Sequence, residues 1–208
     1  MPAQGWPVSI VHGGIGVRPL RLRDAVTWSE LRVRNEQWLA PWEGRQPHLP
    51  PTAWEERHSA GSFAGMLRAL RREARLGLSL PFAVTHDGEL VGQVTVSNIT
   101  RGASQSSTVG YWIDKEHAGQ GVIPMALAMA LDHGFGPAAL HRVEANVRPE
   151  NAASLHVVRK LGFREEGLRS RLMFIDGAWR DHVSFALTAE DQPEGVLKRF
   201  LSSVGDRQ

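Results

Sequence analysis

The sequence predicts a mixed α/β fold in which helices pack on both faces of a central sheet. Residues 107–147 read strand, glycine turn, helix, strand, which is the order of a βαβ unit. On either side of that unit, Asp87-Gly88 and Asp176-Gly177 each separate two β-rich runs, and Asp-Gly is a strong signal for a tight hairpin. A parallel strand pair set among antiparallel hairpins makes a mixed sheet.

Length and composition are those of one ordinary globular domain. The chain has 208 residues, of which 42% are hydrophobic, with a formal net charge of +2. This net charge is much smaller than the positive charge typical of a nucleic-acid-binding domain. We therefore expect no direct nucleic-acid binding. The absence of cysteine excludes disulfides and thiolate chemistry. Neither a secretory signal nor a run of roughly 18 apolar residues is present, so we expect a cytoplasmic protein without membrane contact.

The elements follow one another in a consistent order. The first part, residues 17–76, is rich in arginine and tryptophan and mostly helical in pattern, with a proline-rich break at 47–56. Before it, we expect residues 1–16 to be a flexible segment in which His12–Gly16 is a loose loop. The second part contains, in order, two β-rich runs over 81–99, a strand over 107–114, a helix over 122–133, a strand over 140–147, a helix from Asn151 to Gly162, and strands around 168–175 and 179–188.

The turn before the helix at 122–133 contains Gly119 and Gly121. Glycines ahead of a helix let an anion approach the unpaired backbone N–H groups and the positive end of the helix dipole. On its own, this pair fits an ordinary strand-to-helix turn equally well. Two rival phosphate motifs are missing, because Pro124 stands where a dinucleotide fingerprint needs its third glycine, and no G-x-x-x-x-G-K-[ST] is present.

Three stretches together resemble the GNAT acetyltransferases, and among them the Rim-type ribosomal-protein alanine N-acetyltransferase group. They are VGYWIDKEHAGQGVIPMALAMALDHGF at 109–135, LHRVEANVRPENAASLHVVRKLGFREEGL at 140–168, and FIDGAWRDHVSFAL at 174–187. The resemblance implies one acetyltransferase domain over 17–190, with a mostly antiparallel sheet of about seven strands and a splayed central strand pair. The remaining residues, 191–208, are expected to form a tail that could include a short helix.

The resemblance implies acetyl-CoA as the co-substrate and no metal. In this superfamily the amides of a Q/R-x-x-G-x-G/A turn hold the coenzyme pyrophosphate, and here the turn begins with Glu116. A carboxylate beside a pyrophosphate would be repelled, so we expect the Glu116 side chain to point to solvent. The implied phosphate contacts are Gly119, Gln120, Gly121 and Val122, and the implied strand edge beside the pantetheine arm is Tyr111, Trp112 and Ile113.

The chemistry that the resemblance implies is direct attack of an amine on the acetyl thioester. Asn151 resembles the asparagine that contacts the coenzyme, and Ser154 resembles the hydroxyl that hydrogen-bonds the departing thiolate. Other members of the superfamily use a tyrosine seven residues after that asparagine, but position 158 is valine. Ser154 is therefore our candidate acid. The alternative is that Asn151 and Ser154 only cap a helix.

Glu144 is the candidate general base. It lies on a strand that should be central, where an unpaired carboxylate is costly, so it either faces the cleft or pairs with an arginine. A weak base would suit an α-amine as acceptor, because its pKa near 8 leaves roughly a tenth of it neutral at pH 7.

The predicted function is acetyl transfer to the N-terminal amine of a protein such as a ribosomal protein, together with association with ribosomes. The alternatives are a small-amine or antibiotic acetyltransferase and a non-catalytic acetyl-CoA sensor. Trp38 or Trp42 could wall the acceptor site. An arginine stripe is either a solvated face or a surface for an acidic or ribosomal partner or for the 3′-phosphate of the coenzyme; it consists of Arg68, Arg71, Arg72 and Arg75.

Overall fold

The computed structural model describes residues 5–49 and 52–205. Within them, eight strands form one sheet in the order β1-β2-β3-β4-β5-β6-β8-β7. The strands are β1 (Ile10–His12), β2 (Ile15–Pro19), β3 (Leu80–His86), β4 (Glu89–Thr100), β5 (Ser106–Ile113), β6 (Arg142–Val147), β7 (Arg164–Ile175) and β8 (Ala178–Thr188). All neighbouring strands in this part of the chain are antiparallel except β5 and β6. The mixed, mostly antiparallel sheet predicted from the sequence is therefore confirmed.

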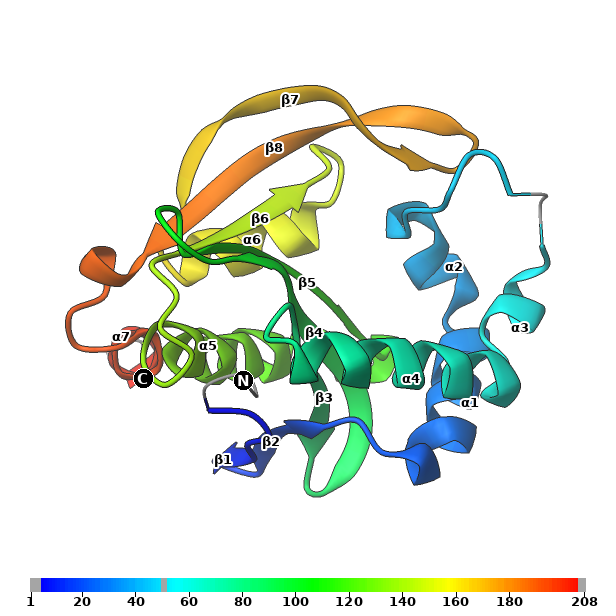
Figure 1. Cartoon of the computed structure of the whole chain (residues 1–208), viewed down its shortest axis with the longest axis horizontal. Coiled ribbons are helices and arrows are strands. Elements are labelled where there is room, and N and C mark those ends of the chain that lie inside the picture. Colours follow the sequence, from blue (N-terminus) through cyan, green and yellow to red (C-terminus); the bar gives the residue numbers. More distant parts are fainter. Residues whose placement is uncertain (1–4, 50–51, 206–208) are drawn as a thin grey trace.

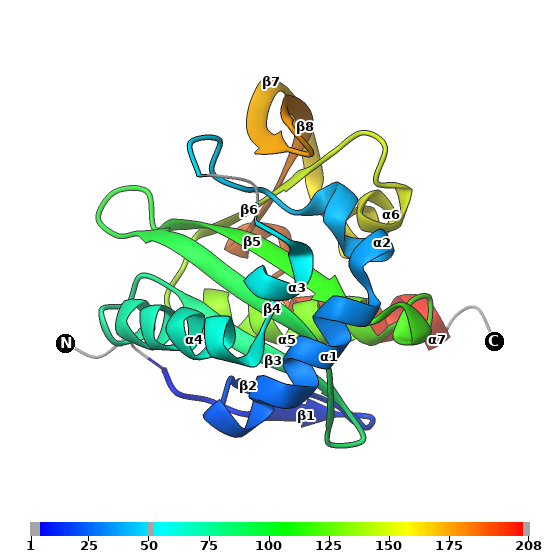
Figure 2. The ribbon, with the colours of Figure 1, turned by 90° about the vertical axis from the view of Figure 1, so that its right-hand side faces the viewer.

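Helices cover both faces of the sheet, as predicted (Figures 1 and 2). They are α1 (Ala25–Arg34), α2 (Glu36–Leu39), α3 (Trp54–Arg57), α4 (Ala60–Arg75), α5 (Val122–Phe135), α6 (Ala152–Lys160) and α7 (Val196–Gly205). One buried cluster joins α5 to the sheet, and a second joins α1 and α4 to the opposite face. Among the described residues, no helix has the length and apolar character needed to cross a membrane.

The structure corrects the prediction for the N-terminal segment. His12–Gly16 is not a loose loop, because β1 and β2 pair as a hairpin in which His12 faces Ile15. Gly13 and Gly14, with φ of +55° and +79°, form the two-residue turn, and a Gly-Gly pair is suited to such a turn because both positions need positive φ. The sheet thus gains a strand before the expected domain start at residue 17. Residues 1–4 of the expected flexible segment lie outside the described residues.

The C-terminal tail contains the expected short helix, α7. It lies against α5 through its buried residues Val196 and Phe200. Asp132 of α5 fixes its start, because the two carboxylate oxygens accept hydrogen bonds from the backbone N–H of Val196 at 2.6 Å and of Leu197 at 3.1 Å. Residues 206–208 of the tail lie outside the described residues.

Helix α5 is apolar on nearly every side because the sheet, α6 and α7 surround it. It connects β5 to β6, and these two parallel strands pair only over Ser106–Thr108 and Arg142–Glu144. Beyond Thr108, β5 pairs with β4 alone. The predicted splay of the central strand pair is therefore confirmed, and it leaves one edge of β5 without a strand partner from position 109 onward.

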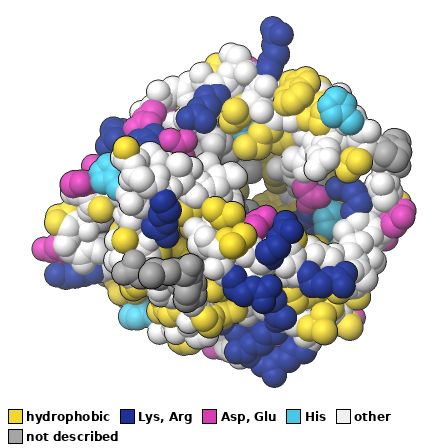
Figure 3. Space-filling view, viewed as in Figure 1, with side chains coloured by type: hydrophobic (Ala, Val, Ile, Leu, Met, Phe, Trp, Pro, Cys, Tyr) yellow, Lys and Arg dark blue, Asp and Glu magenta, His cyan; other side chains and the backbone are white. Residues whose placement is uncertain are grey.

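The arginine stripe lies on the exposed face of α4, where Lys and Arg side chains gather in the space-filling view (Figure 3). Of its members, Arg71 donates a hydrogen bond to the carbonyl of Leu20 at 3.4 Å. The stripe therefore lies on the helix face that points away from the sheet.

Candidate functional site

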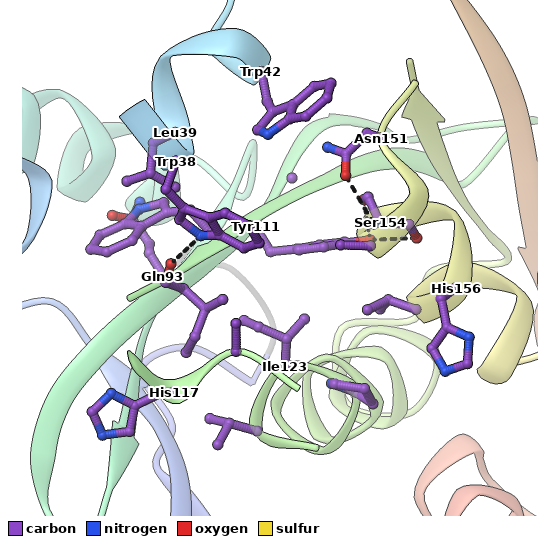
Figure 4. Close-up of a pocket in the computed structure, with 18 of the residues that line it drawn as sticks. Trp38, Leu39, Trp42, Gln93, Tyr111, His117, Ile123, Asn151, Ser154 and His156 are labelled. Carbon is purple, nitrogen blue, oxygen red and sulfur yellow. Dashed lines mark hydrogen bonds between the residues drawn. The ribbon is translucent and has the colours of Figure 1, made fainter. Parts of the chain in front are cut away.

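A cavity of about 780 Å³ opens where β5 and β6 diverge. Its walls come from β4, β5, the glycine turn, the first turn of α6, and the segment around α2 (Figure 4). Most of the sequence-predicted site residues line it, namely Tyr111, Trp112, Ile113, Gly119, Gly121, Val122, Asn151 and Ser154. Gln120 and Glu144 are not among the lining residues. The four residues of the arginine stripe do not line it either.

The glycine turn needs its glycines for conformational reasons. Gly119 and Gly121 have φ of +78° and +80°, a region that costs other residues roughly 1–2 kcal/mol, and a Cβ at either position would meet no atom within 4 Å. Gly121 is the N-cap of α5, and no side chain caps that helix. The first N–H groups of a buried helix therefore face the cavity without a side-chain acceptor, which suits an anion.

Glu116 behaves as predicted, because its side chain is 75% exposed and lies 3.5 Å from Arg34. Gln120 is exposed, and its side-chain amide donates a hydrogen bond to the carbonyl of Glu116 at 2.7 Å. The Gln120 side chain is thus directed back along the turn, so any contact of this residue with an anion falls to its backbone.

Asp114 holds the segment that leads into the glycine turn. It is fully buried, and its carboxylate accepts hydrogen bonds from Arg34 at 2.5 Å, Asn35 at 2.7 Å and His117 at 3.0 Å. Burial alone would raise the pKa of Asp114, but these hydrogen bonds outweigh burial and lower it. The side-chain oxygen of Asn35 also accepts a hydrogen bond from the backbone of Lys115 at 3.0 Å. Helix α1 therefore holds the start of the turn in place.

The first turn of α6 brings three predicted residues together. Asn151 is the N-cap, and its side-chain oxygen accepts a hydrogen bond from the backbone N–H of Ser154 at 3.0 Å. The Ser154 hydroxyl does not serve as the cap; it lies 2.7 Å from the hydroxyl of Tyr111 (Figure 4). Burial raises the pKa of Tyr111 to about 12. Sequence reasoning placed Tyr111 on the strand edge and missed this contact, because the two residues are 43 positions apart.

Glu144 does not reach the cavity. Its carboxylate accepts hydrogen bonds from Arg142 at 3.0 Å and from Arg169 at 3.1 Å. Of the two alternatives left open by the sequence, the structure has the arginine pairing. This arrangement favours a structural role for Glu144 over that of general base, because its carboxylate is held by two guanidiniums and does not line the cavity.

The end of the cavity near α2 is aromatic. Trp38, Trp42 and Trp112 line it, and the first two remain candidates for a wall of the acceptor site. The indole of Trp38 donates to the carbonyl of Ile113 at 3.1 Å, and the guanidinium of Arg148 lies 5.5 Å from the ring of Trp42. These contacts fix the two indoles against β5 and against the segment after β6.

Arg32 and Glu43 line the same end and were missed by sequence reasoning. Arg32 is buried among tryptophan rings, at 5.0 Å from that of Trp54 and 5.1 Å from that of Trp112. Its guanidinium pairs with Glu43, which also pairs with Arg57 at 2.8 Å. No local signal could have found this cluster, because its members come from α1, α3, β5 and the segment after α2.

His58 completes that cluster as a neutral group. Burial and the nearby Arg32 lower the pKa of His58 to about 4.

Among the residues that the structure describes, no group of three or more His, Asp or Glu side chains is arranged to hold a metal ion.

Comparisons with known proteins agree with this geometry. The family model for the acetyltransferase (GNAT) domain matches residues 15–164. Mycobacterium smegmatis RimJ in complex with CoA-disulfide superposes with a TM-score of 0.91 at 43% identity, over 96% of each chain. The [ribosomal protein uS5]-alanine N-acetyltransferase of Escherichia coli (strain K12) is 32% identical over 184 residues, which cover 86% of this chain and 90% of that protein. The probable N-acetyltransferase YjcK of Bacillus subtilis (strain 168) is 38% identical over 108 residues, 52% of this chain and 60% of that protein.

The Asp114 cluster generates a stability prediction. Asp114→Asn should lower the free energy of unfolding at pH 7 by about 2 kcal/mol, because it leaves the donors of Arg34 and His117 without their anion. Since the pKa of Asp114 is lowered in the folded state, this contribution is present above the unfolded pKa near 3.9 and is lost as pH falls through the folded value. Urea unfolding at several pH values measures it.

Asp87→Asn is the matched control, because the Asp87 carboxylate is 82% exposed and its loss should change stability by no more than about 0.5 kcal/mol. Equal effects of the two substitutions at pH 7 would contradict the anchoring role of Asp114.

Proposed function

The chain belongs to the acetyltransferase (GNAT) family, and from that premise we propose that it transfers the acetyl group of acetyl-CoA directly to the α-amine of a protein N-terminus, that of a ribosomal protein in the first place. One observation carries the proposal: an uncapped helix N-terminus behind two positive-φ glycines opens into the same cavity as Ser154, at the gap between β5 and β6. Anion binding and a hydroxyl donor are thus combined in one site.

The residues present suit acetyl-CoA. Its pyrophosphate is an anion of the kind that the free N–H groups at the start of α5 bind, with Gly119, Gly121 and Val122 nearest and Gln120 contributing its backbone. The unpaired edge of β5 from Tyr111 to Ile113 can hydrogen-bond an extended amide-bearing arm as an added strand would. When bound, acetyl-CoA supplies an activated acetyl thioester. Asn151 and Ser154 line the same cavity, and Ser154 contacts Tyr111 of that edge.

In the proposed reaction, the C–N bond forms as the C–S bond breaks, and the electron pair of that bond goes to sulfur. The proton that nitrogen loses balances the proton that sulfur gains. Ser154 is the proposed donor to the departing sulfur, and Asn151 holds the first turn of α6 so that this hydroxyl is in position.

The α-amine is the proposed acceptor because the described lining of the cavity offers no free carboxylate as a base. Among the described lining residues Glu43 is the one carboxylate, and it is engaged by Arg32 and Arg57. An α-amine needs little help, since its reference pKa is near 8. The relative named as a ribosomal protein uS5-alanine N-acetyltransferase supports the same acceptor class. An acceptor on ribosomes would place the protein in the cytoplasm.

An acceptor panel tests the function. The protein with acetyl-CoA should release free thiol with peptides that carry the N-termini of ribosomal proteins, and release it more slowly with N-terminally blocked lysine peptides and with small amines. Faster turnover of small amines would replace the proposal with a small-molecule acetyltransferase. Coenzyme binding without thiol release across the whole panel would leave a non-catalytic acetyl-CoA sensor.

Gly121→Ala tests the pyrophosphate turn. The methyl group imposes positive-φ strain and stands at the start of α5, so we expect acetyl-CoA affinity to fall about tenfold or more by calorimetry. Gly102→Ala is the matched control, because Gly102 also has φ of +78° with no atom within 4 Å of a Cβ, yet does not line the cavity. Unchanged affinity in Gly121→Ala, or an equal loss in the control, would refute the assignment.

Ser154→Ala separates catalysis from helix capping. We expect kcat to fall roughly 100-fold with little change in the calorimetric Kd for acetyl-CoA, and with the helix cap intact, because the cap is made by the Asn151 side chain. Asn151→Ala should instead lower the free energy of unfolding by about 1 kcal/mol. If Ser154→Ala weakens coenzyme binding as much as it slows turnover, the hydroxyl is a structural group.

A further inference from the structure

We propose that Tyr111 is a positioning residue for this reaction: its hydroxyl donates a hydrogen bond to Ser154 Oγ, so that the single proton of Ser154 is directed at the coenzyme sulfur. The inference rests on the proposed function. It gives Tyr111 a role beyond lining the edge of β5 beside the coenzyme. It also explains how Ser154 can act as a proton donor although α6 carries no tyrosine.

The contact that carries the inference is short and specific. Tyr111 Oη lies 2.7 Å from Ser154 Oγ, whereas its distance to the Ser154 carbonyl is 3.4 Å. Both residues line the cavity, and Figure 4 shows the Tyr111 ring crossing from β5 to the first turn of α6. The backbone of Ser154 is held independently by Asn151. Asn151 therefore fixes the position of the serine backbone, and Tyr111 contacts the serine hydroxyl.

The proposed role of Ser154 requires one direction of the hydrogen bond. Two hydroxyl groups share one contact, so either Tyr111 donates to Ser154 or Ser154 donates to Tyr111. Only the first arrangement leaves the Ser154 proton free for a sulfur atom. A phenol is the more acidic of the two groups and thus the better donor, and burial, by raising the pKa of Tyr111 to about 12, keeps that phenol protonated throughout the working pH range.

Without the phenol, Ser154 has another use for its proton. A serine in the first turns of a helix readily donates to a backbone carbonyl three or four residues earlier. Occupation of the Oγ lone pair by Tyr111 does not remove that option, but it fixes the rotamer in which the hydroxyl faces the cavity. We therefore expect loss of the phenol to weaken the donor without displacing the serine.

The thiol of bound coenzyme A provides a test that needs no acceptor. A hydrogen bond from Ser154 stabilises the thiolate, so the pKa of the bound thiol should lie below that of the free thiol by about 1 unit or more. Its titration is followed by the ultraviolet absorbance of the thiolate, with the protein bound to desulfo-coenzyme A as the blank that cancels protein ionisations. Tyr111→Phe, which keeps the ring, should lose most of the shift, and Ser154→Ala should lose it as well.

The outcomes separate the inference from the proposed function. A full shift in Tyr111→Phe with a lost shift in Ser154→Ala would overturn the role of Tyr111 and keep that of Ser154. A full shift in both variants would remove Ser154 as the donor, and the inference with it. Failure of the wild-type protein to bind coenzyme A would overturn the proposed function itself, together with the inference that rests on it.

Kinetics supply the second readout. With an N-terminal peptide as acceptor, Tyr111→Phe should lower kcat about tenfold and leave the KM for acetyl-CoA within about threefold. In the Ser154→Ala background the same substitution should have no further effect, because Tyr111 acts through Ser154. Independent, multiplying effects of the two substitutions, or an effect confined to KM, would show that the tyrosine only packs against the coenzyme.

Discussion

The divergence of β5 from β6 is the constraint on which the site depends. The two strands are parallel and pair over three positions on each, ending at Thr108 and Glu144. Past that point the backbone of β5 has no strand on one side, and residues 110–113 of this part of β5 line the cavity. Because α5 connects the two strands, its N-terminus necessarily opens at the carboxyl end of β5. A free strand edge and an uncapped helix start therefore lie together as a consequence of the topology.

Polar anchors hold the loops around this gap at fixed positions. Asp114 ties the glycine turn to α1 through Arg34 and Asn35. On the far side, the segment after α2 reaches the tip of the β7–β8 ribbon, where the backbone N–H of Arg45 donates to the carbonyl of Phe174 at 3.0 Å. The segment that lines the aromatic end of the cavity is thus tied to the β7–β8 ribbon.

Local signals in the sequence predicted the parts of the site that are local in structure. The glycine turn and the Asn151 cap each lie within a few residues, and both have the predicted form. For Glu144 the sequence left two alternatives, and the structure has the arginine pairing; one partner, Arg169, lies on β7, two strands away in the sheet, which the pattern along a single strand does not reveal. The contact between Tyr111 and Ser154 depends on where α6 docks against β5, which no spacing encodes.

The charge arrangement in the cavity bears on which amine is acetylated. Glu144 lies outside the cavity and Glu43 is shared between Arg32 and Arg57, so neither carboxylate is free to accept a proton from an acceptor amine. At pH 7 an α-amine with a pKa near 8 is about a tenth neutral, whereas a lysine with a pKa near 10.4 is neutral in roughly one molecule in 2,500. The same site would therefore favour the α-amine by about two orders of magnitude from protonation alone. The proposed preference for N-termini would thus need no dedicated base, provided that the departing sulfur has its donor.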